Sequence, residues 1–327
     1  MSQHILVTGG AGYIGSHTCK ALAAQGFIPV VYDNLVHGHE SFVKWGPFVA
    51  GELSDAGRLA ELIETYKPCA AIHFAAFTDV GESVRDPIKY YNNNLFGTFS
   101  FLQTLLDGGI KRIVFSSTAA VYGVPNQIPI PESHTAEPIN PYGMSKRMIE
   151  KMLADFHHAY GLKSICLRYF NASGADPDGE IGEDHTPETH LIPLILDVAM
   201  NRRSHINIFG SDYPTPDGTC VRDYIHVTDL AAAHVLAIDY LLSGGDSSIF
   251  NLGNGQGFSV KEVIETVKAV TGLPIKTELV DRRAGDPPVL VADARRAMDT
   301  LGWRPAYSDI NAIVSHACAW HQKRFGG

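Results

Sequence analysis

A glycine-rich turn near the N-terminus limits the possible folds of this chain more than any other feature. The segment "VTGGAGYIGSH" follows a short apolar run (5–9) and leads into a stretch with the pattern of a helix (15–26). It contains Gly10-x-Gly12-x-x-Gly15 and also Gly9-x-x-Gly12-x-x-Gly15. Glycines at these spacings permit a tight turn and let the backbone approach a pyrophosphate, which the free N–H groups of the helix N-terminus also attract. The turn therefore predicts a strand–helix unit that binds a dinucleotide.

The rest of the first half alternates apolar runs with amphipathic stretches. Apolar, β-branched runs occur at 28–33, 70–76, 112–118 and 164–171, with a helical stretch around 88–107 and another from 142. Continuous apolar strands separated by helices indicate a parallel sheet that is covered on both faces. We therefore predict an α/β fold with a doubly wound parallel sheet.

The second half contains long loops rich in Gly, Pro and Asp. "NASGADPDGEIGEDHTPETH" and "GSDYPTPDGTCVRD" are such loops, and loops of this length in a compact protein usually carry function. We expect a first domain over 1–175, to which 224–255 returns. Residues 176–223 and 256–327 are then expected to form a smaller C-terminal α/β domain.

Composition excludes several classes of protein. The 327 residues carry a formal charge of −9, which argues against a nucleic-acid or anionic membrane surface. The five cysteines are widely spaced and form no CxxC pair, so neither a disulfide framework nor a zinc ribbon is indicated. The fifteen histidines show no HExxH spacing, and we expect no metal site. With neither a signal peptide nor a membrane-length apolar run visible, we expect a cytoplasmic protein.

Asp33 indicates which dinucleotide the turn accepts. It ends the second apolar run, 24 positions after Gly9. A carboxylate there can accept hydrogen bonds from both ribose hydroxyls of an adenosine, and it repels a 2′-phosphate. The spacing therefore favours NAD over NADP.

The segment "PYGMSK" places Tyr142 and Lys146 at i and i+4, on one face of a predicted helix. Such a pair is commonly no more than a solvated polar face. Upstream, however, "FSSTAAVYG" ends a buried strand with hydroxyl residues up to Thr118, at the sheet edge where the glycine turn places a dinucleotide. The three side chains are therefore candidates for a catalytic group.

The energetics of the phenol support that hypothesis. A free phenol has a pKa of about 10 and a general base works best near 7, which corresponds to about 4 kcal/mol of preference for phenolate. An exposed ion pair supplies only ~0–1 kcal/mol. A partly buried site with Lys146 and a nicotinamidium ring nearby can supply more. We therefore predict that Tyr142 is a base and acid beside oxidised NAD.

The chain resembles the extended short-chain dehydrogenase/reductase family over nearly its whole length, and within it the enzymes that epimerise nucleotide sugars. The stretches that carry the resemblance are "VTGGAGYIGSH", "YYNNNLFGT", "FSSTAAVYG", "NPYGMSK", "LRYFNASGA", "RRAGDPP" and, above all, "DYPTPDGTCVRDYIHV". The resemblance implies an NAD-binding Rossmann domain and a C-terminal domain that closes over a UDP-sugar. It also implies reversible inversion at C4 of a UDP-hexose (UDP-glucose or UDP-galactose) through a 4-keto intermediate, in a homodimer that pairs through the helices following Ser100 and Tyr142.

The same resemblance implies the site residues. The catalytic residues are Tyr142, Lys146, which also holds the nicotinamide ribose and lowers the tyrosine pKa, and Thr118, which bonds the 4-oxygen of the sugar. The NAD-binding residues are Gly9, Gly12, Tyr13, Ile14, Gly15, Asp33, Asn34, Glu52, Leu53, Phe74, Ala75, Ala76, Asn93, Thr118, Tyr142, Lys146 and Phe170. The substrate-binding residues are Thr118, Tyr142, Asn171, His190, Leu191, Phe209, Arg222, Arg283, Asp286 and Leu290. Two of these, Arg222 and Arg283, can neutralise a diphosphate, and Phe209 can stack on uracil.

The sequence departs from the family pattern at three places. Glu52 stands where an aspartate is usual, so it must reach the adenine with one more methylene. Thr78 replaces a lysine found in some members, and no role is transferred to it. Thr189 and His190 stand where many members have two asparagines, which removes one side-chain contact to the substrate.

Three other functions compete with UDP-hexose epimerisation. A nucleotide-sugar 4,6-dehydratase usually carries Asp-Glu after the strand-end Ser/Thr, whereas Ala119 and Ala120 follow here. An epimerase of a UDP-pentose or a UDP-N-acetylhexosamine is a second alternative, and the bulk of Leu290 argues against the N-acetyl group. A non-catalytic NAD-bound sensor is a third, but such proteins typically lose the tyrosine or the lysine that this chain keeps.

Overall fold

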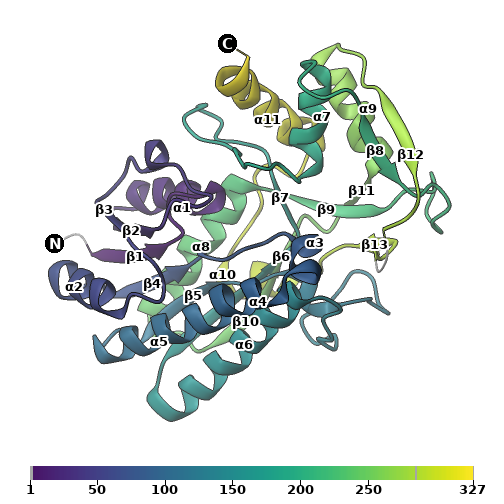
Figure 1. The fold of residues 1–327 in the computed structure, drawn as a ribbon. Helices are drawn as coiled ribbons and strands as arrows, with labels where there is room; N and C mark the ends of the chain where they lie inside the picture. The colour runs from purple at the N-terminus through teal and green to yellow at the C-terminus, as the bar shows by residue number, and fades with distance from the viewer. Residues whose placement is uncertain (1–2, 284–285, 327) are drawn as a thin grey trace.

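A seven-stranded sheet lies at the centre of the computed structural model, which describes residues 3–283 and 286–326 (Figure 1). The strand order is β10-β6-β5-β4-β1-β2-β3, and every pairing in it is parallel. The order changes direction between β1 and β4, and ligands bind at such a switch point in open α/β sheets. The predicted doubly wound parallel sheet is thus confirmed. Its strands are β1 (His4–Thr8), β2 (Ile28–Asp33), β3 (Phe48–Ala50), β4 (Ala70–His73), β5 (Arg112–Ser116), β6 (Lys163–Tyr169) and β10 (Ser248–Leu252).

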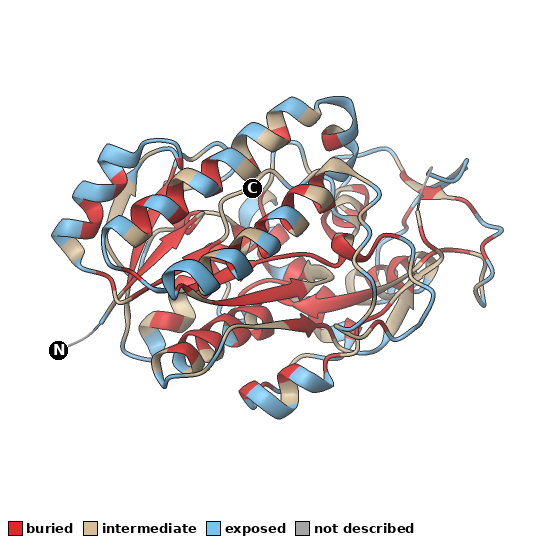
Figure 2. Cartoon of the chain, turned by 90° about the horizontal axis from the view of Figure 1, so that it is seen from below, coloured by how far each residue is buried: buried red, intermediate tan, exposed pale blue. Residues whose placement is uncertain are grey.

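Helices cover both faces of this sheet. Alternate residues of β1 separate the two cores, since Ile5 and Val7 pack on one face and Leu6 on the other. Figure 2 shows the buried strands between helices whose outer sides are exposed. The apolar runs are therefore buried on both sides, as parallel strands require. The first face carries α1 (Tyr13–Ala24), α8 (Val227–Leu242) and α10 (Arg295–Leu301), and the second α2 (Ala56–Tyr66), α5 (Gly97–Asp107) and α6 (Pro141–Tyr160).

A second, smaller core lies at the upper right of Figure 1. Its elements are α7 (Leu191–Ala199), β8 (Ile206–Phe209), α9 (Val260–Thr271), β12 (Thr277–Val280) and α11 (Ile310–Phe325). Strands β8 and β12 pair in parallel. A four-stranded sheet joins the two cores; it consists of β7 (Asn171–Ser173), β9 (Val221–His226), β11 (Gly257–Ser259) and β13 (Val289–Leu290).

One segment within 256–327 packs with the large sheet. Ala297 and Leu301 of α10 and the fully buried Trp303 belong to the core beneath α1 and α8. The Trp303 indole N–H donates to the carbonyl of Asp229 in α8 at 2.9 Å. The chain therefore returns to the large sheet before α11, and the sequence pattern gave no indication of this return.

The helical stretch around 88–107 is interrupted. It consists of α4 (Pro87–Tyr90), a π-helical segment η2 (Tyr91–Phe96) and α5. The Asn94 side chain accepts from the Phe77 N–H and donates to the Phe77 carbonyl, both at 2.9 Å. Single π-helical turns are frequent at functional sites. Here the turn ties the loop after β4 to the helix. The remaining short helices are α3 (Val80–Arg85), η1 (Glu40–Phe42) and η3 (Ala119–Tyr122).

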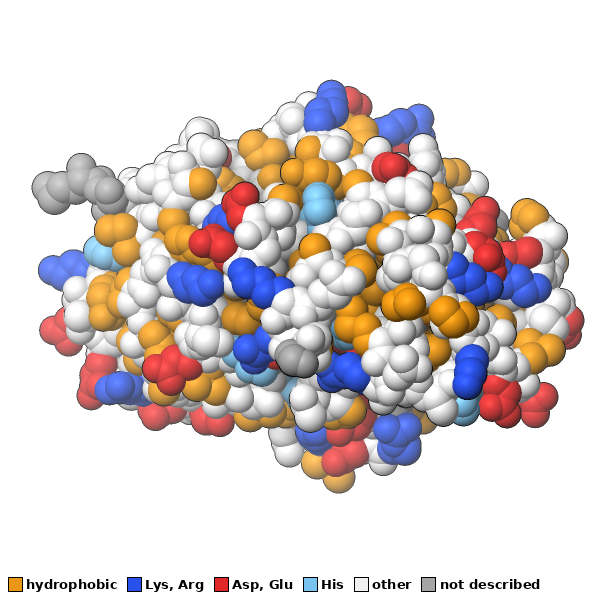
Figure 3. Space-filling view, turned by 90° about the horizontal axis from the view of Figure 1, so that it is seen from above, with side chains coloured by type: hydrophobic (Ala, Val, Ile, Leu, Met, Phe, Trp, Pro, Cys, Tyr) orange, Lys and Arg blue, Asp and Glu red, His pale blue; other side chains and the backbone are white. Residues whose placement is uncertain are grey.

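The surface in Figure 3 shows acidic and basic side chains intermixed rather than gathered into one area of a single charge. Across the described part of the chain, no helix has both the length and the apolar character needed to cross a membrane.

A buried ion pair joins α6 to the sheet. Arg168 of β6 donates to both carboxylate oxygens of Glu150 in α6, at 2.8 and 2.6 Å, and both side chains are fully buried. Ser117 donates to the same carboxylate at 2.7 Å, and Arg147 donates to it at 3.0 Å. The remaining Arg168 donor reaches the Tyr122 hydroxyl at 3.0 Å. Desolvated charges are stable only when paired in this way.

Replacing Arg168 by Met is expected to lower the free energy of unfolding by about 3–5 kcal/mol, because Glu150 keeps a buried charge without its main partner. Urea unfolding followed by tryptophan fluorescence measures the change. The control is Arg58→Met, which removes an exposed ion pair with Glu61 and should cost ~0–1 kcal/mol. Equal losses in the two variants would show that the buried pair does not hold α6 in place.

Candidate active site

The glycine turn brings β1, β4 and α1 into direct backbone contact. Gly9 has φ +73°, and a Cβ on it would lie 2.6 Å from the backbone nitrogen of Ala75. A Cβ on Gly15 would lie 2.1 Å from the carbonyl oxygen of Gly9. Helix α1 begins after Gly12 with no side-chain cap and no acidic residue in its first turn, which contains Tyr13 and Ile14. These free N–H groups fit an anionic diphosphate.

Asp33 lies beside this turn. One of its carboxylate oxygens accepts from the Ala11 N–H at 3.0 Å and the other from the Leu35 N–H at 2.8 Å. Burial raises the pKa of this carboxyl, although the backbone hydrogen bonds oppose the rise. The side chain is thus fixed at the carboxyl end of β2, at the position expected for the adenosine ribose.

Asn34 and Glu52 extend the same edge of the sheet. The Asn34 amide donates to a Glu52 carboxylate oxygen at 3.0 Å. Glu52 is exposed, whereas the neighbouring Leu53 is buried and lies against Gly97. The longer glutamate therefore reaches Asn34, and its contact with adenine stays a prediction.

The residues after β4 line the opposite side of the switch point. The N–H groups of Phe74 and Ala75 donate to the Thr8 carbonyl at 3.0 and 3.2 Å, which holds 74–76 (Phe74, Ala75, Ala76) against the glycine turn. Asn93 lies in η2 and donates to the Asn94 side chain at 2.9 Å. These predicted NAD-binding residues therefore lie along one edge of the sheet.

Thr118 and Tyr142 meet because the start of α6 packs directly on η3. A Cβ on Gly143 would lie 2.6 Å from the Ala120 carbonyl oxygen, so glycine allows this close approach. The Asn140 side chain caps the helix by accepting from the Gly143 N–H at 2.8 Å. Thr118 and Tyr142 are only 9% and 8% exposed, and the Thr118 hydroxyl is near enough to the phenol to oppose the rise of its pKa.

In the protein alone, burial dominates the pKa values of both Lys146 and Tyr142. Burial raises the pKa of Tyr142 to about 12, with the Thr118 hydrogen bond opposing the rise, and burial lowers the pKa of Lys146 to about 7. The Lys146 ammonium nitrogen donates to the Ser116 carbonyl at 2.8 Å and lies 4.9 Å from the centre of the Phe115 ring. Desolvation disfavours both charged forms, so in the protein alone the phenol stays neutral. A further positive charge is needed to form the phenolate.

The C-terminal segments bring the predicted substrate residues together in two pairs. The Arg283 guanidinium lies 3.9 Å from the centre of the Phe209 ring, at the end of β8. Arg222 of β9 forms an ion pair with Asp286 and donates to the Val221 carbonyl at 2.8 Å. One face of the ring predicted to stack on uracil is therefore covered by a cation.

Leu290 connects these residues to the catalytic edge. It pairs in register with Arg222 between β13 and β9. Its side chain packs with a small apolar cluster that includes Ala119 and Phe170. Asn171 begins β7, in register with Tyr224 of β9. The small joining sheet thus brings Leu290 to the apolar cluster around η3, which directly follows Thr118.

His190 and Leu191 begin α7, and His190 belongs to a cluster that the sequence did not predict. His190 contacts the Glu183 carboxylate, and His185 lies 3.4 Å from Glu183 and 3.6 Å from Glu188. Burial lowers the pKa of His185, but its contacts with the two glutamates outweigh this and raise the pKa to about 10. The sequence pattern that could have indicated this cluster is a repeated spacing of five residues, from Glu183 to Glu188 and from His185 to His190.

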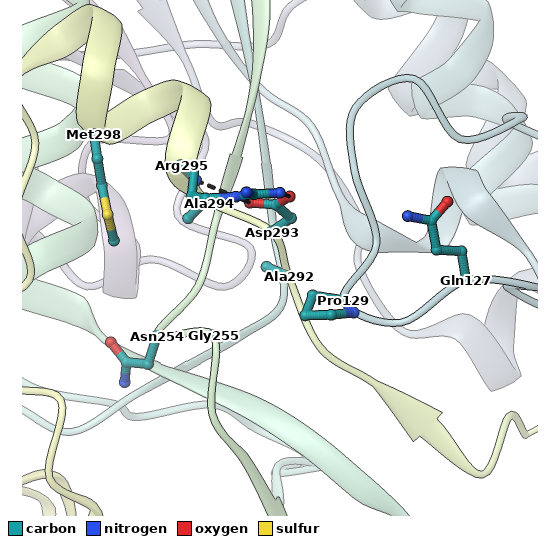
Figure 4. A pocket seen from close by; sticks show the side chains of 9 residues that line it. All are labelled: Gln127, Pro129, Asn254, Gly255, Ala292, Asp293, Ala294, Arg295 and Met298. Atoms are coloured by element: carbon teal, nitrogen blue, oxygen red, sulfur yellow. Dashed lines mark hydrogen bonds and ion pairs between the residues drawn. The ribbon is translucent and has the colours of Figure 1, made fainter.

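A cavity of about 340 Å³ lies elsewhere, between the loop before α10 and the segment around Gln127 (Figure 4). Asn254, Arg295 and Met298 line it, and Arg295 is paired with Asp293 at 2.6 Å. None of the predicted catalytic, cofactor or substrate residues lines this cavity. The candidate site is therefore defined by the residues at the carboxyl edge of the large sheet.

Comparisons with known proteins agree with this assignment. A model of the NAD dependent epimerase/dehydratase family matches residues 5–253. The chain is 53% identical over 326 residues to the UDP-glucose 4-epimerase of Rhizobium meliloti, covering 100% of this chain and 99% of that one. It is similar to a solved UDP-glucose 4-epimerase from Brucella ovis in complex with NAD, with TM-score 0.95, 52% identity and coverage of 97% and 98%. A Bifidobacterium longum UDP-glucose 4-epimerase in complex with NAD+ and UDP has TM-score 0.93, 37% identity and coverage of 98% and 99%.

The buried Lys146 is expected to make stability rise with pH. The unfolded lysine keeps its proton up to its ordinary pKa of 10.5, whereas the folded one releases it near 7. Between these values the unfolded state binds more protons, so the free energy of unfolding increases with a slope of up to about 1.4 kcal/mol per pH unit. The difference between wild type and Lys146→Met, measured by urea unfolding across this range, isolates the effect.

Lys151→Met is the matched control for this measurement, because Lys151 is an exposed lysine on the same helix. Its pH profile should follow that of wild type. A wild-type profile parallel to that of Lys146→Met would contradict the lowered pKa.

Proposed function

The chain belongs to the NAD dependent epimerase/dehydratase family, and on that basis we propose that it is an NAD-dependent enzyme that inverts C4 of a UDP-hexose and so interconverts UDP-glucose and UDP-galactose. The observation that carries the proposal is the buried contact of Tyr142 with Thr118, directly beside Lys146. Full-length similarity to UDP-glucose 4-epimerases from several bacteria supports it.

The edge of the large sheet fits NAD. The crowded glycines and the uncapped start of α1 suit the diphosphate, and the fixed carboxylate of Asp33 suits the adenosine ribose. We propose that Lys146 holds the nicotinamide ribose. When bound, NAD would supply the redox chemistry of a reversible hydride transfer at C4 of the sugar.

Tyr142 then moves the proton at the 4-oxygen of the sugar. It accepts the proton as the 4-keto sugar forms and returns it after the sugar has presented its other face. Thr118 donates a hydrogen bond to the same oxygen and keeps it beside the phenol. Because burial favours the neutral phenol, Tyr142 becomes a base only when the oxidised cofactor places positive charge in the site.

The UDP moiety has to be held while the sugar turns. We propose that Arg222 and Arg283 neutralise the diphosphate, with Asp286 orienting Arg222, and that uracil stacks on the free face of Phe209. Asn171, His190, Leu191 and Leu290 are proposed to complete the pocket. In this division, 1–175 and 224–255 bind NAD, and 176–223 with most of 256–327 bind the UDP-sugar.

Tyr142→Phe is expected to lower the rate of UDP-galactose conversion by about 10²- to 10⁴-fold, the usual contribution of a positioned acid–base group. The assay uses purified protein without added NAD and separates UDP-glucose from UDP-galactose. Tyr160→Phe, an exposed tyrosine at the end of the same helix, is the control and should keep the full rate. A Tyr142→Phe protein with wild-type turnover would refute the assignment.

The same assay decides between the related substrates. Incubation with UDP-N-acetylgalactosamine and UDP-xylose tests the two alternative epimerase activities. Leu290 belongs to the same apolar cluster as Ala119 and Phe170, and its bulk favours the smaller hexose pocket. We therefore propose UDP-glucose and UDP-galactose as the substrates, and efficient turnover of the N-acetylated sugar would correct this.

We further propose that the protein works as a homodimer in the cytoplasm. Helices α5 and α6 lie side by side, with the Phe99 and Phe156 rings 6.2 Å apart, and expose Phe99 and Met148 by 43% and 39%. Paired helices with exposed large apolar side chains suit a helix–helix interface with a second copy. All five cysteines are free thiols, which suits a reducing compartment.

Phe99→Glu is expected to convert the dimer into a monomer, because a carboxylate would be buried without a partner in the interface. Light scattering after size-exclusion chromatography measures the mass. The matched control is Leu279→Glu, at an exposed leucine of β12 far from these helices. A wild-type protein with the mass of one chain would reject the dimer.

A further inference from the structure

We propose that Glu183, His185, Glu188 and His190 bind one divalent transition-metal ion of the zinc class. One ligand atom from each of the four residues lies within 4.8 Å of all the others. The proposed site is separate from the catalytic group and does not depend on the proposed epimerase activity.

The spacing of His185 from the two glutamates suits a small tetrahedral ion, whereas His190 and Glu183 are in direct contact and have to separate to admit it. Zn–N and Zn–O bonds are about 2.0–2.2 Å, which places neighbouring ligands of a tetrahedron roughly 3.3–3.6 Å apart. Nδ1 of His185 lies 3.4 Å from Glu183 Oε1 and 3.6 Å from Glu188 Oε2. A set of two imidazoles and two carboxylates is a zinc-type donor set, and four protein ligands close the coordination shell as in structural sites.

The backbone around the cluster is already fixed. The Glu183 carbonyl accepts from the Trp320 indole N–H at 3.0 Å, and Gly182 lies flat against the same indole. The second carboxylate oxygen of Glu188 accepts from the N–H groups of Thr189 and His190 at 2.7 and 2.8 Å. Glu188 is thereby oriented with one oxygen toward His185, as outer-shell hydrogen bonds orient metal ligands.

Charge also favours a cation at this position. Glu183 is buried and Glu188 is mostly buried, so the two carboxylates need positive charge close by. With neutral imidazoles, the four side chains carry a charge of −2, which one divalent ion cancels. Protonation of the two histidines would supply the same positive charge without a metal ion. A measurement of metal binding distinguishes the two cases.

The position of the cluster defines what a bound ion would do. His190 caps the start of α7, and the His185 ring lies 6.1 Å from the ring of Tyr13 in the glycine turn. Tyr13 in turn donates to the Gly174 carbonyl at 2.7 Å. An ion here would hold the loop before α7 against the turn and leave the second ring nitrogen of His190 available to another partner.

The test measures metal binding directly. Protein treated with a chelator and desalted is titrated with ZnCl₂ in competition with a chromogenic zinc chelator, without NAD or UDP-sugar. We expect one equivalent of Zn²⁺ per chain, and CoCl₂ is expected to give the strong visible absorption of four-coordinate Co²⁺. The double variant His185→Asn/Glu188→Gln should bind Zn²⁺ more than about 100-fold more weakly, beyond the loss usual for an outer-shell contact.

His205→Asn is the matched control, because it removes an exposed histidine that lies 3.1 Å from Glu278 outside the cluster. It should bind Zn²⁺ like wild type. Less than one equivalent in wild type, or equal affinity in wild type and the double variant, would overturn the proposal. The wild-type titration decides the matter even if the double variant fails to fold, and neither result bears on the epimerase assay.

Discussion

The buried ion pair between Glu150 and Arg168 fixes the position of α6 on the large sheet, and the meeting of Tyr142 with Thr118 depends on that position. Glu150 follows Lys146 by one helical turn, so both side chains project from the same face of α6. That face meets the end of β5 at successive residues. Lys146 donates to the Ser116 carbonyl and Glu150 accepts from the Ser117 hydroxyl. Together they fix the rotation and the depth of the helix, and the helix start then carries Tyr142 to Thr118.

The same burial controls the chemistry. In the protein alone, burial raises the pKa of Tyr142 to about 12 and lowers that of Lys146 to about 7, so the Tyr142 phenol stays neutral. In the proposed reaction, the positive charge that favours the phenolate would come with bound oxidised NAD. The proposed proton transfer at Tyr142 would therefore be coupled to the redox state of NAD, which suits a reaction that ends with the cofactor in its starting form.

Much of the fold could be predicted from the sequence, because apolar runs and glycine spacing are local signals of strands and turns. The sheet, the glycine turn and the meeting of Thr118 with Tyr142 follow from them. Other features depend on tertiary contacts. Lys146 turns to a backbone carbonyl because burial penalises its charge, and Trp303 returns to the large sheet, where its indole is buried and donates to the Asp229 carbonyl. Arg168 could have predicted the buried ion pair from the sequence, since a charged residue within an apolar strand requires a buried partner.

Several segments of the chain connect the large sheet with the smaller core, because the chain crosses the joining sheet more than once and returns at α10. The chain passes from the large sheet to the small core through β7 and comes back into the joining sheet at β9. After β11 the chain enters the small core again, and it returns through β13 to α10 on the large sheet. It then passes to the small core a last time to form α11. A protein whose units are linked once can swing open widely about a single hinge, whereas several parallel tethers permit only small relative rotations. A single proteolytic cut in one tether would accordingly leave both units attached.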